Sequence, residues 1–191
     1  MSPHKLATIA AIALAALSVG LVFSELEHAV RNRLPLSDAA IIREQAAEKH
    51  LDPALIAAVI YAETKFEPRP SSAGAQGLMQ ILPATAYYLA RLSGGSRFTA
   101  GDLATPRVNL AYGSYYLRYL LNHYDGNEML TVAAYNGGIA NVDNWVEQAR
   151  AGGRELTVEA IPFGETRDYV RRVLAAQTAY RATYPYELGL R

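Results

Sequence analysis

The chain has no cysteine among its 191 residues, and this absence excludes several classes of protein. Without thiols it forms no disulfide scaffold, zinc-thiolate site, thiol-based active site or cysteine-linked lipid anchor. Neither sign of charge is in excess, because 18 Lys and Arg balance 18 Asp and Glu. Nucleic-acid-binding proteins normally carry a basic patch, so we expect no nucleic-acid partner. A neutral polymer, such as a glycan, remains compatible with this composition.

Familiar cofactor and metal motifs are also missing. The sequence has no glycine-rich phosphate loop, nucleophile elbow, His-Glu-x-x-His pair or EF-hand acidic run. We therefore expect neither a cofactor nor a metal ion. Phe and Trp are scarce, at 4 and 1, whereas there are 13 Tyr. Amphipathic tyrosine rings suit surfaces that are half dry and half hydrogen-bonding, although ordinary packing between helices is the favoured explanation.

The N-terminus carries one long apolar run, residues 6–23, which no charge interrupts. As a helix it is about 27 Å long, enough to span the hydrocarbon core of a bilayer. This favours an uncleaved membrane anchor for residues 1–23, with a cleaved export signal or a buried core helix as alternatives. Basic residues flank the run on both sides, so the positive-inside rule does not settle its orientation. Residues 24–36 are predicted to be a short stalk.

From residue 37 onward the pattern is helical, and we predict one all-α domain over 37–184 with a tail at 185–191. Ser37 is a candidate N-cap for a first helix that ends near residue 50. Asp52-Pro53 and Thr105-Pro106 combine a capping residue with proline at the first helical position. No segment alternates with a period of two for long enough to predict a strand. The later helices are predicted at 53–64, 83–92, 106–124, 128–135, 139–149 and 164–184.

Glu63 is the carboxylate that departs from a solvent-facing pattern. It follows Ile56, Val59 and Ile60 at helical spacing and therefore lies on their apolar stripe. A carboxyl group that is partly desolvated there keeps its proton near neutral pH, as a general acid requires. Alternatively, Glu63 turns outward into water from the last turn of its helix. Periodicity alone leaves both interpretations open.

The segments around Glu63 in sequence supply polar groups for a binding groove. Residues 67–77 form a loop rich in Pro, Ser and Gly, and Gly77-Leu78-Met79-Gln80 adds an amide. Residues 133–138 place Tyr135 and Asn136 where a helix meets two glycines. One acid with amides and a tyrosine hydroxyl suits a neutral substrate rich in hydroxyl groups. The residues therefore favour a glycan-cleaving enzyme.

Four motifs in order then resemble a known family. They are ETKFEP at 63–68, SSAGAQGLMQILP at 71–83, AYNGG at 134–138 and IPFGETRDYV at 161–170. Together they are similar to the catalytic domain of the Slt-type lytic transglycosylases, relatives of goose-type lysozyme, over about residues 37–184. The resemblance implies a lysozyme-like helical fold. It also implies cleavage of the β-1,4 bond from N-acetylmuramic acid to N-acetylglucosamine in peptidoglycan, without water, giving 1,6-anhydromuramic acid ends.

The resemblance also implies roles for individual residues. Glu63 is the implied single acid and base, which protonates the glycosidic oxygen and then deprotonates the C6 hydroxyl. The N-acetyl group of the substrate would stabilise the developing positive charge. The implied groove residues, which bind the substrate, are Ser71, Gln80, Ala134, Tyr135, Asn136, Glu165 and Tyr169.

Two departures from the family pattern affect these assignments. Thr64 stands where the family usually has serine, and it retains a hydroxyl group. The loop from Glu63 to Gly74 is one residue shorter than the common pattern, which leaves Ser71 or Ser72 at the serine position. Ser71 is favoured because it alone satisfies Ser-x-x-Gly. Arg167 fits either a structural contact or a contact to a peptide stem.

The leading hypothesis is a monomeric, membrane-anchored lytic transglycosylase that acts on peptidoglycan glycan strands. Its expected place is the cell envelope, at the outer face of the cytoplasmic membrane, or exported if the N-terminal segment is cleaved. One alternative is a muramidase that hydrolyses the same bond with water. The other is a non-catalytic glycan-binding module. Such a module would be expected to have lost the catalytic acid, and Glu63 is present.

Overall fold

The computed structural model describes residues 18, 19, 22, 33–68, 71–94 and 98–190. The chain divides into two compact units, residues 1–35 and residues 36–191. The anchor or signal predicted for residues 1–23, and the stalk that follows it, lie almost wholly outside the described residues. Within the described part of the chain, no helix is both long enough and apolar enough to cross a membrane.

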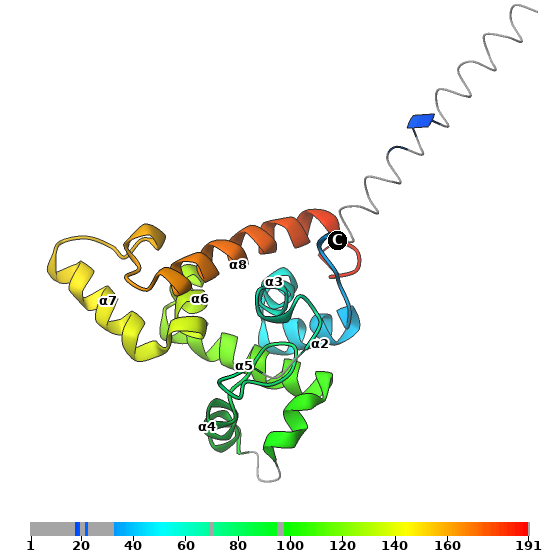
Figure 1. Cartoon of the computed structure of the whole chain (residues 1–191), viewed down its shortest axis with the longest axis horizontal. Helices are drawn as coiled ribbons and strands as arrows, with labels where there is room; N and C mark the ends of the chain where they lie inside the picture. Colours follow the sequence, from blue (N-terminus) through cyan, green and yellow to red (C-terminus); the bar gives the residue numbers. More distant parts are fainter. Residues whose placement is uncertain (1–17, 20–21, 23–32, 69–70, 95–97, 191) are drawn as a thin grey trace, which may run out of the picture. The chain divides into compact units, whose positions relative to one another are not determined.

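The second unit is built from helices, as the sequence predicts (Figure 1). Across its described residues the β structure amounts to an isolated bridge between Gln76 and Ile81. Two short 3₁₀ helices, η1 and η2, were not predicted. The elements are α2 (Ala39–Lys49), α3 (Pro53–Thr64), α4 (Pro83–Ser93), η1 (Ala100–Ala104), α5 (Pro106–His123), α6 (Glu128–Gly137), α7 (Ile139–Ala151), η2 (Val158–Ala160) and α8 (Gly164–Thr183).

Local capping explains where the helices begin. At α3 the Asp52 carboxylate accepts a hydrogen bond from the Ala54 amide at 3.0 Å, and Pro53 occupies the first helical position. Ser37 was predicted to cap the first helix, and this was wrong. The N-cap is Asp38, in a left-handed conformation with φ of 54°. The Ser37 hydroxyl donates instead to the Asp38 carboxylate, at 2.7 Å.

Helix α3 forms the centre of the fold. Residues 54–60 are all buried, as expected for a helix that is apolar on every side. Helix α8 packs along it more extensively than any other element, and Figure 1 shows α3 nearly end-on beneath α8. Edge-to-face contact between Tyr61 of α3 and the buried Tyr180 of α8, 6.1 Å apart, is part of this interface. A rigid central helix thus carries Glu63 in its last turn.

The segment after α8 is also folded. Leu188 and Tyr184 are buried, and the Arg43 guanidinium of α2 donates to the Glu187 carbonyl. Residues 184–190 therefore pack back onto the body of the second unit.

Candidate active site

Glu63 is half-buried in the last turn of α3. Burial raises the pKa of its carboxyl group from 4.5 to about 7. A hydrogen bond from Tyr169 and the positive charge of Arg172 oppose this rise in pKa, while the charge of Glu165 adds slightly to it. Periodicity left open whether Glu63 is a desolvated acid or turns outward into water. The structure agrees with the desolvated acid. At a pKa near 7 one group can both give and take a proton at neutral pH.

Tyr169 of α8 is the partner that orients the acid. Its hydroxyl donates to Glu63 Oε1 at 2.7 Å, and its ring is buried. Burial and then the charge of Glu63 raise the pKa of Tyr169 well above its ordinary value, so it stays a neutral donor. The Arg172 guanidinium lies 5.9 Å from the centre of the same ring, within cation–π range.

Thr64 fastens the end of α3 to the loop that follows. Its buried hydroxyl donates to the carbonyl oxygen of Leu78 at 2.8 Å and contacts that of Ile60 at 3.2 Å. This hydroxyl holds the Gly77–Gln80 turn against the helix that carries the acid.

Asn109 of α5 organises this turn, and the sequence analysis missed it. Its side-chain oxygen accepts from the Met79 amide at 2.8 Å, and its side-chain nitrogen donates to the Gln76 and Leu103 carbonyls at 2.8 and 3.1 Å. Gly77, with φ of +73°, permits this approach, since a Cβ there would lie 2.2 Å from Asn109 Nδ2. The available signal was a polar residue on the buried stripe of α5, the same signal that identified Glu63.

Tyr135 joins α6 to the same turn. Its hydroxyl donates to the Met79 carbonyl at 2.8 Å, and burial followed by the charge of Glu63 raises its pKa well above the ordinary value. Helix α5 closes the other side of Met79 at Gly113, where a Cβ would lie 2.3 Å from the methionine sulfur. The loop around Met79 is therefore held by α3, α5 and α6 together.

Ser71 and Gln80 belong to the turns of the same loop. Ser71 Oγ accepts from the Ala75 amide at 2.9 Å, whereas Ser72 is exposed. Gln80 adopts φ of +49° and its side-chain amide donates to the Gly77 carbonyl at 2.9 Å.

The other residues that the resemblance assigns to a groove, apart from those already described, lie on α6 and α8. Asn136 Oδ1 accepts from the buried Thr166 hydroxyl at 2.8 Å, and Ala134 is buried. Glu165 is exposed in the first turn of α8. Arg167 donates to the Ile161 carbonyl at 3.0 Å. The sequence left open a structural contact or a contact to a peptide stem for Arg167, and this bond is a structural contact.

The structure thus brings Glu63, Tyr169 and Tyr135 to one region, braced by backbone and side-chain hydrogen bonds from four helices. Among the described residues, no group of three or more His, Asp or Glu is arranged to hold a metal ion. The site contains one carboxyl group, that of Glu63, with a pKa near neutral pH and with hydroxyl and amide groups around it. This arrangement is suited to proton transfer.

Comparison with known proteins places this geometry in a family. The family model described as "Transglycosylase SLT domain" matches residues 40–158, more than half of the chain. The soluble lytic murein transglycosylase of Escherichia coli strain K12 is 33% identical over 164 residues, which are 84% of this chain and 25% of that protein. The chain therefore spans about a quarter of the length of this relative.

Solved structures agree with the sequence match. The 70 kDa soluble lytic transglycosylase of Escherichia coli has a TM-score of 0.75 and 32% identity, covering 80% of this chain and 25% of that one. An inactive glutamate-to-glutamine variant of the lytic transglycosylase Slt from Pseudomonas aeruginosa has a TM-score of 0.74 and 32% identity, with the same coverage. From the site, the sequence match and the shared fold together, we conclude that this chain belongs to the transglycosylase SLT domain family.

Proposed function

We propose that this chain is a peptidoglycan lytic transglycosylase with Glu63 as its single acid and base. The substrate bond is the β-1,4 link from N-acetylmuramic acid to N-acetylglucosamine. The observation that carries the proposal is the half-buried Glu63, with a pKa raised to about 7, in a chain of the SLT family. We infer the substrate from membership of the family. The carboxyl group of Glu63, with its pKa near neutral pH, supplies the proton transfer that cleavage requires.

In the first step the protonated Glu63 donates its proton to the glycosidic oxygen. The bond from C1 of muramic acid to that oxygen breaks, and the N-acetylglucosamine end leaves as a neutral alcohol. The carbonyl oxygen of the substrate's own N-acetyl group stabilises the positive charge at C1. Glu63 is now a carboxylate, and the Tyr169 hydroxyl at 2.7 Å stabilises it in that form.

In the second step the Glu63 carboxylate takes the proton of the C6 hydroxyl on the same muramic acid. The C6 oxygen attacks C1 and closes the 1,6-anhydro ring, which returns Glu63 to its protonated state without consuming water. A group that acts as acid and then as base works best with a pKa near the operating pH.

A single acid distinguishes this scheme from the usual two-carboxylate glycosidases. Glu165 is exposed, and its charge is the smallest of the four influences on the pKa of Glu63. We assign Glu165 to substrate binding, together with Ser71, Gln80, Ala134, Tyr135, Asn136 and Tyr169.

Mass spectrometry of the products released from purified peptidoglycan by the full chain tests the reaction. Transglycosylation gives products that are lighter by one water and carry no reducible end. Reducible muramic acid ends would mean a hydrolytic muramidase instead. Binding of glycan strands without release of any product would mean a non-catalytic module.

We also propose that residues 1–23 anchor the chain, as a monomer, at the outer face of the cytoplasmic membrane. The uninterrupted apolar run at 6–23 supports this assignment. The intact mass of the chain recovered from cells, together with its partition between membrane and soluble fractions, tests it. A mass lacking the N-terminal segment would identify a cleaved export signal.

A further inference from the structure

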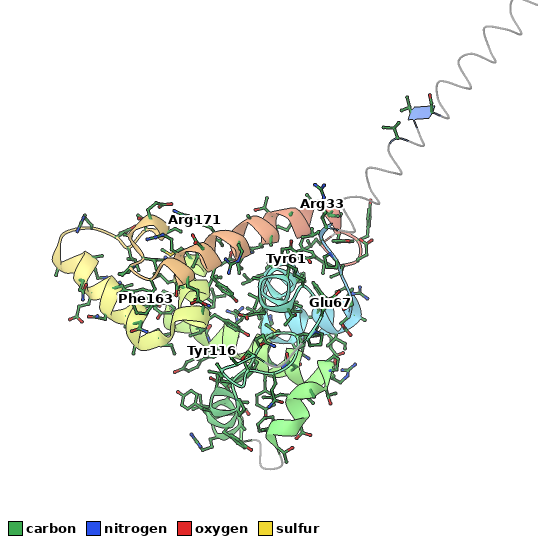
Figure 2. All side chains as sticks on the ribbon, viewed as in Figure 1. Arg33, Tyr61, Glu67, Tyr116, Phe163 and Arg171 are labelled. Atoms are coloured by element: carbon green, nitrogen blue, oxygen red, sulfur yellow. The ribbon has the colours of Figure 1, made fainter. Side chains whose placement is uncertain are left out.

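A row of tyrosine rings leads from the candidate active site across α5 to α4. The ring centre of Tyr135, whose hydroxyl contacts Met79, lies 5.4 Å from that of Tyr116. Tyr116 stacks on Tyr119 at 6.4 Å with 16° between the ring planes, and Tyr119 meets Tyr88 of α4 edge-on at 6.0 Å. In Figure 2 the labelled Tyr116 lies between α6 and α4. We call these four residues the tyrosine row.

The row is desolvated at its inner end and open at its outer end. Burial raises the pKa of Tyr116 to about 12, whereas Tyr88 is 39% exposed. Tyr88 shares the outer face of α4 with Tyr87, 44% exposed, and Leu92, 49% exposed. A contiguous exposed patch of large apolar side chains is a mark of an interaction site or a ligand-binding groove. This surface is continuous, ring by ring, with the site around Glu63.

The outer end also offers hydrogen bonds of both kinds. The hydroxyl groups of Tyr88 and Tyr119 are 3.1 Å apart, so one donates to the other. The hydroxyl that accepts keeps its own hydrogen for an external acceptor, and both oxygens retain lone pairs for an external donor. The row contains no carboxylate, ammonium or guanidinium group. A pyranose ring, with an apolar C–H face and hydroxyl groups at its edge, matches this combination of flat ring and paired hydroxyls.

We propose that the tyrosine row is an extended glycan-binding surface that holds sugars of the same strand beyond the bond at Glu63. This inference rests on the proposed function, because it takes the occupant to be the strand that Glu63 cleaves. Its consequence is a preference for long glycan strands over short ones, expressed in binding rather than in the chemical step.

Binding to the full-length Glu63→Gln chain tests the inference without turnover. The probes are peptide-free glycan strands prepared from peptidoglycan, one fraction long and one of tetrasaccharides, titrated by calorimetry. Adding Tyr88→Ala is expected to weaken binding of the long strands about three- to tenfold, the effect of one lost aromatic contact. Binding of tetrasaccharides is expected to stay the same. Tyr186→Ala is the matched control, because Tyr186 is 73% exposed and lies outside the row.

Kinetics of the otherwise unaltered enzyme give a second readout. On long strands, Tyr88→Ala is expected to raise KM with kcat unchanged, because the contact is made equally in the ground and transition states. Tyr119→Phe keeps the ring and removes one hydroxyl, so it is expected to have the smaller effect.

Three results would overturn the inference. The first is wild-type affinity of the Tyr88→Ala chain for long strands, and the second is an equal loss of affinity for both probes. The third is an altered oligomeric state in sedimentation with unaltered glycan binding, which would make the α4 face a contact between chains. Conversely, if the wild-type chain released no product while binding to long strands still depended on Tyr88, the row would stand and the proposed reaction would fail.

Discussion

The two ends of α3 carry the same chemical group in opposite surroundings. Asp52, at the N-terminus, is surrounded by donors. It accepts from the Ala54 amide at 3.0 Å and from Gln177 Nε2 at 2.6 Å, and the Arg181 guanidinium lies 2.9 Å away. Within the described part of the chain, Tyr169 is the one donor in hydrogen-bond reach of Glu63 at the other end.

Helix polarity reinforces this difference. The N-terminus of a helix carries a partial positive charge that stabilises an anion, and the C-terminus carries a partial negative charge that disfavours one. The Asp52 carboxyl group therefore joins helices α3 and α8 through its contacts with Gln177 and Arg181. Glu63 is half-buried at the unfavourable end, and its pKa rises to about 7. Position and partners, rather than the carboxyl group itself, decide which residue is structural and which can transfer protons.

Removing the carboxyl group of Glu63 is the strongest test of this contrast. We expect Glu63→Gln to lower turnover of peptidoglycan by about 10³-fold, because general acid and base catalysis are both lost. The amide is nearly isosteric and can still accept from Tyr169, so the fold is expected to persist by circular dichroism. Turnover is measured by release of soluble muropeptides.

Glu147→Gln is the matched control for this change, because Glu147 is exposed on α7. It is expected to retain wild-type turnover. A folded Glu63→Gln chain that remained active would remove Glu63 from the mechanism.

The raised pKa of Glu63 also predicts how stability depends on pH. The pKa rises from 4.5 to about 7 on folding, so the folded state binds the proton more tightly than the unfolded state. The contribution of Glu63 to stability is then full below pH 4.5 and lost as pH rises through 7. The wild-type chain should lose up to about 3 kcal/mol relative to Glu63→Gln over this interval. Urea unfolding of both chains at several pH values measures it, and parallel curves would contradict the desolvation of Glu63.

At the opposite end of α3, replacement should affect stability and spare chemistry. We expect Asp52→Ala to lower the free energy of unfolding by about 2 kcal/mol, since an N-cap and the bonds from Gln177 and Arg181 are lost together. Glu44→Ala, which breaks the exposed ion pair with Arg107, should cost less than about 1 kcal/mol. Denaturant titration measures both changes. An unstable Glu44→Ala chain and a stable Asp52→Ala chain would reverse the comparison.

Interactions between residues close in sequence could be predicted for this site, whereas interactions between residues far apart in sequence could not. Helix α3 was predicted because its signals are local, namely the Asp52-Pro53 cap and an apolar run. The protonation of Glu63 was left open because its burial comes from packing between segments far apart in the chain. Its partner Tyr169 is 106 residues away and was found through the family resemblance, not through periodicity. A helical pattern identifies the face on which a residue lies, and it does not identify the distant side chain that this face meets.

The omissions come from contacts between distant segments, whereas the error at Ser37 comes from a contact with its neighbour in sequence. Asn109 joins α5 to carbonyls of a loop that precedes it by about thirty residues, so no local pattern connects them. Ser37 was predicted as a cap from its residue type, but the adjacent Asp38 takes up its hydroxyl. The tyrosine excess was visible in the composition, yet its arrangement into a row required α4, α5 and α6 to be placed together.

A finer test of the difference between Asp52 and Glu63 is to remove the Tyr169 hydroxyl, which donates to Glu63, while keeping the tyrosine ring. The Tyr169 hydroxyl lowers the pKa of Glu63, so Tyr169→Phe should raise that pKa above its value of about 7. In the proposed reaction Glu63 acts first as an acid, so activity should fall as pH rises through this pKa. The alkaline limb of the pH profile should therefore move upward in Tyr169→Phe. The base step loses a hydrogen bond to a carboxylate, so its activation free energy should rise by about 1.5–3 kcal/mol. This rise corresponds to a fall in kcat of about 10- to 150-fold. The pH dependence of kcat and kcat/KM on soluble glycan strands measures both changes.

Arg172→Gln tests the effect of the Arg172 charge on the pKa of Glu63 separately from that of the Tyr169 hydrogen bond. The Arg172 guanidinium also lowers the pKa of Glu63, but less than the Tyr169 hydroxyl does. The alkaline limb should therefore move in the same direction by a smaller amount, with kcat at its plateau nearly unchanged. The shift should shrink as salt rises, since the interaction of an exposed charge is screened whereas a buried hydrogen bond is not. A downward shift, or one larger than that of Tyr169→Phe, would mean that Arg172 acts on Glu63 through something other than its charge.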